Sequence, residues 1–198
     1  MAWTDTGLFL REFARDPLHT AALAPSSRAL AAAMTAPIPA TGAPVVVELG
    51  PGTGAFTRAI AERTGGRARQ LAVELNPRWA ALLADRHPEV DVVCADAHTL
   101  PALLAERGID RVDAVVSGLP WVAYSPGSDG RGLHAVITDA LADDGVFTQF
   151  AYSWTRWAPP ARRQLADLRT HFAQVTTSPV VRRNLPPAVV RRARTPLR

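Results

Sequence analysis

Lysine is absent from this sequence of 198 residues, and cysteine occurs once, as Cys94. A single cysteine excludes a disulfide within the chain and a metal cluster held by thiolates. Because Cys94 lies in the apolar run 92–94, we expect a buried core residue. The five histidines show no metal-ligand spacing, so we expect no bound metal and place them at the surface or at helix caps. They are at positions 19, 87, 98, 134 and 171.

Long apolar runs are also missing, and we expect no signal peptide at the start of this sequence. No run approaches the roughly 18 apolar residues of a membrane-spanning helix. The first residues include Asp5, Glu12 and Asp16 and lack the basic stretch and apolar core of a signal peptide. Hydrophobic residues make up 47% and charged residues 20%, as in globular proteins. We therefore expect a cytoplasmic protein with one well-buried domain.

Positive charge is carried by arginine and gathers near one end of the chain. Residues 1–43 contain three arginines and three acids, and residues 44–150 contain nine arginines and fourteen acids. Residues 151–198 contain ten arginines and one acid. Such a basic segment favours an anionic partner: a phospholipid surface, a nucleic acid or a phosphorylated substrate. The alternative is a solvated face, since arginine takes every cationic role here.

Residues 1–40 are predicted to form a helical extension of two pieces. Ser26 or Ser27 can cap the second helix, which runs to Met34 before prolines prevent its continuation. We expect this extension to form a substrate lid or a membrane contact, and residues 41–198 to form the main domain.

Strand and helix patterns alternate through the main domain. Short β-branched runs predict strands buried on both faces, and apolar residues at helical spacing follow most of them. This order predicts an α/β fold: a doubly wound, mostly parallel seven-stranded sheet with helices on both faces. The predicted strands are residues 45–47, 71–74, 90–95, 112–117, 146–150, 175–181 and 188–190.

Caps and apolar spacing also predict the helices. Asn76 can cap a helix that starts at Pro77 and buries Trp79, Leu82 and Leu83. Four further helices are predicted. One contains Phe56, Ala59 and Ile60, two span residues 100–107 and 133–141, and the last contains Leu165, Leu168 and Phe172.

A glycine-rich loop follows the first predicted strand and reads Glu48, Leu49, Gly50, Pro51, Gly52, Thr53, Gly54. Glycines at a helix N-terminus let the backbone turn tightly and approach a ligand closely. Glu74 closes the second strand 20 residues beyond Gly54, where its carboxylate would accept from both ribose hydroxyls. A nucleotide cofactor is predicted, but Gly50, Gly52 and Ala55 also satisfy the dinucleotide pattern.

Further motifs cover nearly the full chain. Residues 117–120 read Ser-Gly-Leu-Pro, and residues 184–188 read Asn-Leu-Pro-Pro-Ala. The whole pattern resembles class I S-adenosylmethionine-dependent methyltransferases. More closely, it resembles the bacterial phospholipid N-methyltransferase family, related in sequence to the rRNA adenine dimethyltransferases. Other matching residues are Phe9, Leu10, Arg11, Ala24, Pro25, Ser26, Ser27, Leu30, Met34, Gln149, Phe150 and Tyr152.

The resemblance implies a Rossmann-like enzyme that binds S-adenosylmethionine and releases S-adenosylhomocysteine. Glu48 would help position the methionine end, and Asp96 would approach the adenine amino group. A plain helix cap is the alternative for Asp96. The implied cofactor-binding residues are Glu48, Gly50, Pro51, Gly52, Thr53, Gly54, Glu74, Leu75, Asp96, Ala97 and Ser117.

The end of the fourth strand is the expected place of methyl transfer. In-line displacement needs a positioned nucleophile with a free lone pair and no metal. Unperturbed serine is a poor base, so Ser117 is expected to orient the acceptor, where the related nucleic-acid enzymes carry asparagine. Gly118, Leu119 and Tyr152 complete the predicted catalytic set. The alternative is that Gly118 and Pro120 only shape a turn.

Five aromatic residues gather near this point, Trp121, Tyr124, Tyr152, Trp154 and Trp157. They could hold an increasingly cationic substrate, suit a lipid interface or simply pack in the core. We single out Tyr152 and Trp121.

The leading functional hypothesis is N-methylation of the amine of a phosphatidylethanolamine-type phospholipid. Phe9 and Phe13 of an amphipathic helix 3–16, with arginines of residues 182–198, would contact an anionic membrane peripherally. Val189 replaces the aromatic residue common in the family, so a small-molecule methyltransferase of a biosynthetic pathway is the alternative. An RNA adenine methyltransferase is disfavoured, because we expect no room in this sequence for the C-terminal helical domain that those enzymes usually have. A non-enzymatic binding module is a further alternative.

Overall fold

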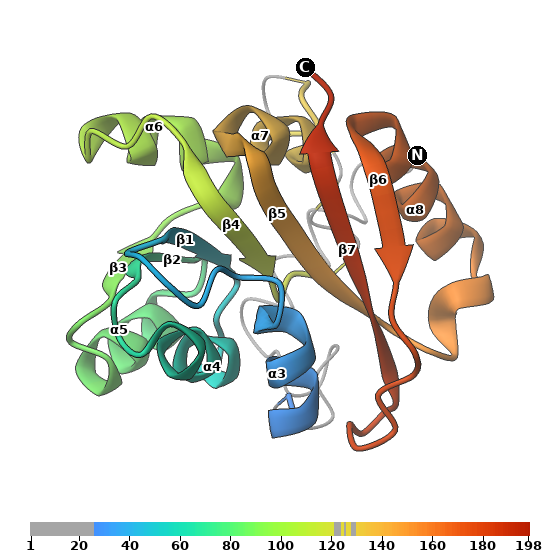
Figure 1. Ribbon diagram of the computed structural model, residues 1–198, viewed down its shortest axis with the longest axis horizontal. Helices are drawn as coiled ribbons and strands as arrows, with labels where there is room; N and C mark the ends of the chain where they lie inside the picture. The colour runs from blue at the N-terminus through green and yellow to red at the C-terminus, as the bar shows by residue number, and fades with distance from the viewer. Residues whose placement is uncertain (1–25, 121–123, 125, 128–129) are drawn as a thin grey trace.

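The computed structural model describes residues 26–120, 124, 126–127 and 130–198. A seven-stranded sheet with the order β3-β2-β1-β4-β5-β7-β6 forms its centre (Figure 1). Neighbouring strands from β3 to β5 run parallel, whereas β7 runs antiparallel to both β5 and β6. The strands are β1 (Val45–Leu49), β2 (Arg69–Glu74), β3 (Asp91–Cys94), β4 (Val112–Ser117), β5 (Leu141–Tyr152), β6 (Phe172–Thr177) and β7 (Ala188–Pro196).

Helices cover both faces of this sheet (Figure 1). Side chains alternate along β1, so that Val46 packs with residues of α3 and α4 while Val47 and Leu49 pack with residues of α6 and α7. The predicted doubly wound α/β fold is therefore confirmed. One face carries α3 (Arg28–Thr35), α4 (Ala55–Thr64) and α5 (Pro77–Arg86), and the other carries α6 (Leu100–Glu106), α7 (Leu133–Ala140) and α8 (Pro159–His171).

Parallel pairing brings the carboxyl ends of three strands to one edge of the sheet. Leu49 of β1 lies level with Val73 of β2 and with Ser117 of β4. Between β1 and β4 the strand order reverses, because β2 and β3 lie on one side of β1 and β4 lies on the other. Ligands of open α/β sheets bind beside the strand ends at such a reversal. The glycine loop and residues 117–120 meet at this point.

The buried face of α5 was only partly predicted. Asn76 Oδ1 accepts from Arg78 N and Trp79 N, which confirms the predicted cap. Leu83 is buried, but Leu82 is 37% exposed and Trp79 is half-buried. The helix covers the margin of the sheet, where a small cluster offers it few apolar partners. That cluster contains Ala72, Leu83 and Val90.

Cys94 is exposed, so the expectation of a buried core cysteine is wrong. It ends β3, which pairs only with β2 at the edge of the sheet and buries none of its residues fully. The Cys94 Sγ lies 3.8 Å from the carbonyl oxygen of Leu75.

The C-terminal strands differ in extent from their prediction. β5 already begins at Leu141, with an irregular register against β4, and β7 continues to Pro196 because it pairs on both sides. Phe172, expected in a helix, is the first residue of β6. The predicted strand 175–181 stops at residue 177, and Val181 forms only an isolated bridge with Ala188.

The second helical piece of the predicted extension is α3, and Ser27 Oγ accepts from Leu30 N at its start. The predicted helix 3–16 and Trp121 lie outside the described residues. In the part of the chain that the structure describes, no helix has the length and apolar character needed to cross a bilayer.

Candidate active site

The loops after β1 and β4 touch each other through two glycines. A Cβ atom on Gly118 would lie 2.5 Å from the carbonyl oxygen of Gly50, and one on Gly50 would lie 2.6 Å from Leu119 Cδ2. Gly118 N also donates to Leu49 O at 2.8 Å. A side chain on Gly118 would collide with backbone, so packing requires glycine there, whereas at Gly50 the positive φ angle of 68° favours glycine.

Gly52 and Gly54 differ in what surrounds them, although both have positive φ angles, 51° and 82°. A Cβ atom on Gly54 would lie 2.9 Å from Leu83 Cδ1, against α5. A Cβ atom on Gly52 would meet nothing within 4 Å. Gly54 therefore packs against side chains inside the protein, whereas Gly52 borders open space.

Glu74 lies under the glycine loop and holds it to the end of β2. Its Oε2 accepts from Gly52 N at 3.1 Å, and its Oε1 accepts from Asn76 N at 2.9 Å. Burial raises the pKa of the Glu74 carboxyl group, against the lowering effect of these backbone hydrogen bonds. Glu74 therefore lies beside the glycine loop at the end of β2, where its position was predicted.

Glu48 is fully buried between β1 and α4. Its Oε2 accepts from Thr57 Oγ1 at 2.7 Å and from Gln70 Nε2 at 3.0 Å. Its Oε1 is buried and has no hydrogen-bond partner among the described residues. Burial raises the pKa of Glu48 from its ordinary value of 4.5 to about 7. This carboxyl group can therefore change its protonation state near neutral pH.

Asp96 follows β3 and caps the short 3-10 turn Ala97–Thr99. Its Oδ1 accepts from His98 N at 2.9 Å and contacts His98 Nδ1 at 3.0 Å, and the hydrogen bond from the His98 ring lowers the pKa of Asp96. Asp96 thus forms the helix cap that we gave as the alternative to a contact with adenine. Ala97 is buried against the core beside it.

Ser117 is fully buried at the end of β4. Its Oγ accepts from Tyr124 Oη at 2.6 Å and from Leu119 N at 3.3 Å. The two lone pairs of this hydroxyl group are therefore both engaged within the protein, and the role of Ser117 toward a substrate stays a prediction. The expectation overlooked Tyr124, whose buried hydroxyl needs a partner. Burial raises the pKa of Tyr124.

Tyr152 ends β5, three residues beyond Gln149, the β5 partner of Ser117. Its ring packs edge-on against Phe150, which in turn contacts Phe56 of α4. Trp154 and Trp157 are strongly exposed, as is Leu75 at the end of β2. Tyr152 and Leu75 border the same sheet edge as the loop.

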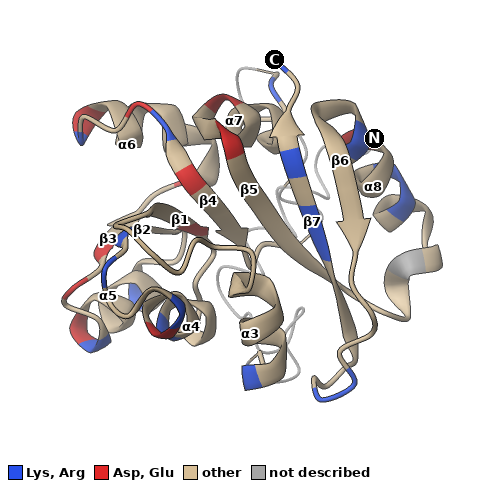
Figure 2. Ribbon diagram, in the orientation of Figure 1, with Lys and Arg blue, Asp and Glu red and all other residues tan. Residues whose placement is uncertain are grey.

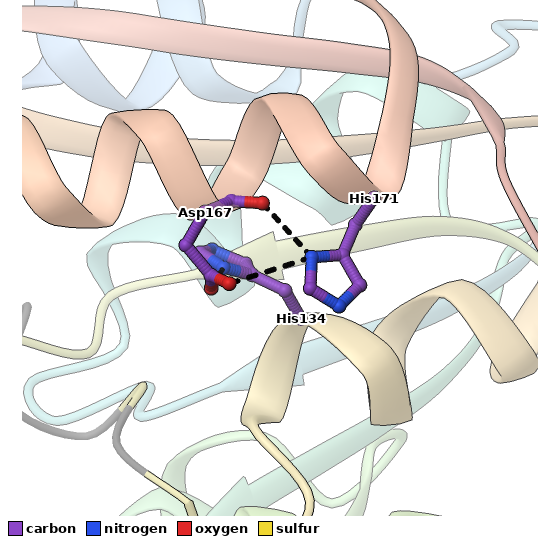
Figure 3. Close-up of side chains that lie close together, drawn as sticks. All are labelled: His134, Asp167 and His171. Atoms are coloured by element: carbon purple, nitrogen blue, oxygen red, sulfur yellow. Dashed lines mark hydrogen bonds and ion pairs between the residues drawn. The ribbon is translucent and has the colours of Figure 1, made fainter.

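His134, expected at the surface, is fully buried, and this expectation is wrong. Figure 3 shows it beside Asp167 and His171, which come from α8 while His134 comes from α7. His134 Nδ1 lies 2.6 Å from Asp167 Oδ2, and His171 Nδ1 lies 3.6 Å from Asp167 Oδ1. The three side chains offer donor atoms within 4.8 Å of one another, but these atoms already contact each other directly. The group joins two helices on the face opposite α3.

Comparison with known proteins agrees with this arrangement. A family model described as a methyltransferase domain matches residues 46–145. An ornithine lipid N-methyltransferase of Singulisphaera acidiphila is 40% identical over 148 residues, which cover 73% of this chain and 77% of the relative.

Solved structures share the fold at low sequence identity. TrmN from Thermus thermophilus gives a TM-score of 0.63 at 19% identity, over 83% of this chain and 48% of that chain. Fibrillarin from Aeropyrum pernix, solved with natively bound S-adenosyl-L-methionine, gives a TM-score of 0.59 at 17% identity, over 83% of this chain and 73% of that chain. The chain belongs to the class I S-adenosylmethionine-dependent methyltransferases.

Proposed function

We propose that this S-adenosylmethionine-dependent methyltransferase N-methylates the amine of a lipid headgroup. The observation that carries the lipid assignment is the 40% identity to an ornithine lipid N-methyltransferase over most of both chains. An ethanolamine phospholipid and an ornithine lipid both present a primary amine, and these are the two acceptors that we propose to compare.

The described loop fits the cofactor. Open space beside Gly52 lies next to the Glu74 carboxylate, where ribose hydroxyls would find an acceptor. The unpartnered Oε1 of Glu48 offers a buried acceptor or, when protonated, a donor for the methionine end. Leu75, Asp96 and Ala97 would line the adenine side, with the remaining loop residues Gly50, Pro51, Thr53 and Gly54 shaping the cradle. When bound, S-adenosylmethionine supplies an electrophilic methyl group on its sulfonium sulfur.

The turn at residues 117–120 would hold the acceptor amine. Because Tyr124 and Leu119 N occupy the lone pairs of Ser117, its role would be to fix this turn. The backbone carbonyl groups of Gly118 and Leu119 would then accept the amine hydrogens, and Tyr152 would border the acceptor at the end of β5. The amine attacks as the free base, since a protonated amine has no lone pair to donate.

A soluble small-molecule acceptor is the second candidate. The observation in its favour is Val189, which replaces the aromatic residue common in the phospholipid family and is buried in β7 opposite Ala151.

The test is methyl transfer from labelled S-adenosylmethionine by the purified protein, with vesicles that contain ethanolamine lipid, ornithine lipid or neither. We expect labelled lipid with one, two or three added methyl groups, resolved by mass spectrometry, from one of the first two. Glu74→Ala protein, which we expect to be inactive, is the matched control. In a parallel assay, a cell extract replaces the vesicles. If neither lipid is labelled and label appears only in the water-soluble fraction of that extract, the lipid proposal is rejected in favour of a small-molecule acceptor.

A further inference from the structure

The face of the sheet beside α3 carries a polar groove over β7 and β6, and β7 lies two strands away from β4, which ends at the proposed catalytic turn. Its volume is about 330 Å³, which corresponds to roughly ten water molecules at liquid density. Six residues line it, and none is acidic: Ala36, Pro37, Gln174, Thr176, Arg192 and Arg194. The groove can therefore hold a group larger than a single small ion.

Strand pairing explains why these side chains gather. Arg192 lies opposite Thr176, and Arg194 lies opposite Gln174, in the antiparallel pair of β7 and β6. Residues two apart on a strand point to the same face, so both guanidinium groups project beside α3. Figure 2 shows basic segments on β7 next to β6, which carries no charged residue.

Both guanidinium groups are weakly satisfied by the protein. Arg192 Nη2 and Arg194 Nη2 reach the carbonyl oxygens of Ala33 and Pro37 only at 3.5 Å, and Arg194 Nη1 reaches Asp144 O at 3.4 Å. Over the described ranges, neither arginine has a carboxylate within ion-pair distance. Arg192 Nε is buried and lacks any hydrogen-bond partner there. Buried donors without a partner are rare in folded proteins.

The neighbouring arginine shows the contrast. Arg191 points to the opposite face, is 3% exposed, and donates to Gln164 Oε1 at 2.9 Å and to Ala161 O at 3.3 Å. Its donors are used to join β7 to α8. The donors of Arg192 and Arg194 remain available for an acceptor from outside the chain.

We propose that Arg192, Arg194, Gln174 and Thr176 form a binding site for a phosphoryl group, separate from the methyl-transfer site. Two guanidinium groups with an amide and a hydroxyl donor match the several acceptor oxygens of a phosphate, and guanidinium groups bind such oxyanions in pairs of hydrogen bonds. The phosphoryl group can come from a soluble phosphate compound or from a phospholipid headgroup.

The experiment compares Arg192→Gln combined with Arg194→Gln against Arg162→Gln combined with Arg163→Gln. The second pair lies exposed on α8 and removes the same charge from the opposite face. Inorganic phosphate and pyrophosphate are titrated by heteronuclear NMR, and vesicles with and without phosphatidic acid are tested by flotation. Binding of S-adenosylhomocysteine checks that each variant is folded.

We expect saturable phosphate binding that the groove variant weakens about tenfold or more and the α8 variant leaves nearly unchanged. Groove-dependent flotation that phosphate displaces identifies the lipid headgroup as the source, whereas phosphate binding without flotation identifies a soluble ligand. Equal weakening in both variants, or no saturable binding of either probe to the wild-type protein, overturns the proposal. Both outcomes are independent of methyl transfer, which is measured separately.

Discussion

Glu74 and Glu48 are both buried carboxylates beside the glycine loop, yet their oxygen atoms are satisfied differently. Both oxygens of Glu74 accept backbone N–H groups, from Gly52 and Asn76. Only one oxygen of Glu48 has partners, and these are the side chains of Thr57 and Gln70. Glu74 thus holds the loop in place and also offers an acceptor, whereas Oε1 of Glu48 is a buried acceptor without a partner among the described residues.

Replacement of Glu74 by alanine is expected to weaken binding of S-adenosylhomocysteine strongly. Two lost ribose hydrogen bonds to a charged group contribute roughly 1.5 to 3 kcal/mol each. Calorimetric titration measures the affinity, with Glu62→Ala on the exposed side of α4 as control. A folded Glu74→Ala protein with wild-type affinity would show that the ribose lies elsewhere.

Two alanine substitutions in the loop are expected to act on different properties. Gly54→Ala should lower the melting temperature more, because its Cβ would meet Leu83 at 2.9 Å. Gly52→Ala meets no atom of the protein, so its stability cost is limited to the positive φ angle, about 1–2 kcal/mol, while its methyl group enters the proposed cofactor space. Thermal unfolding and calorimetric titration measure both. Normal cofactor affinity in Gly52→Ala would contradict contact between this loop and the ligand.

Glu48 is expected to make stability depend on pH near neutrality. Its pKa is about 7 in the folded protein and 4.5 ordinarily, so between these values only the folded state binds the proton. The free energy of unfolding therefore falls as pH rises from about 4.5 to 7, by roughly 3 kcal/mol at most. Denaturant unfolding of Glu48→Gln, which keeps the shape of the neutral group, should lack this component. An unchanged pH profile in the variant would reject the raised pKa.

At the scale of elements, His134 of α7 and Asp167 of α8 join these two helices. Burial lowers the pKa of His134, and hydrogen bonding to Asp167 only partly opposes this. As pH falls below 6.5, unfolded histidine takes up a proton that the folded His134 resists. The free energy of unfolding should therefore fall over this range, opposite in sign to the effect of Glu48. The pKa of Asp167 is lowered, so its own contribution is lost only in stronger acid.

Replacement of His134 by asparagine separates the two effects. Asparagine keeps a donor for Asp167 and does not titrate, so the loss of stability between pH 7 and 5 should shrink relative to wild type. Denaturant unfolding at several pH values measures this, with His87→Asn, at a partly exposed position, as control. An identical slope in wild type and His134→Asn would contradict the buried neutral histidine.

Local patterns were sufficient to predict the parallel half of the sheet. Caps such as Asn76 and β-branched runs such as 45–47 depend on neighbours in sequence, and both appear where expected. The ends of β5 and β7 depend instead on pairing between distant segments, and they were placed too short. The same difference between local and distant contacts explains which parts of the candidate site were predicted. Glu74 follows from spacing, whereas the bond from Tyr124 to Ser117 depends on how the chain returns after β4.

At the scale of the whole molecule, the arginines of the C-terminal segment do not form one patch. Arg191 is buried against α8, while Arg192 and Arg194 line the groove beside α3. Arg198 pairs with Asp143 at 2.6 Å. Arg191 therefore does not belong to the solvated face that the sequence suggested as an alternative. Arginines that are neighbours in sequence have different surroundings in the fold.

At the same scale, we expect contact with an anionic membrane that involves Phe9 and Phe13. Wild-type protein should float with anionic vesicles at low salt and lose this binding as salt screens the arginines. Phe9→Glu combined with Phe13→Glu should not float. Leu82→Glu combined with Leu197→Glu replaces two exposed apolar residues by the same charges and serves as control. Wild-type protein that ignores anionic vesicles would remove the physical support for a lipid acceptor.

The exposed edge strand β3 gives this enzyme a built-in labelling position. Cys94 is the sole thiol of the chain, and its Sγ lies beside the carbonyl group of Leu75, the residue that follows Glu74. A maleimide fluorophore would attach at one place without any engineered substitution, at the margin of the proposed cofactor cleft. Its emission would then follow cofactor arrival and departure in real time, on the native sequence, and so separate the lifetime of the bound state from the rate of turnover.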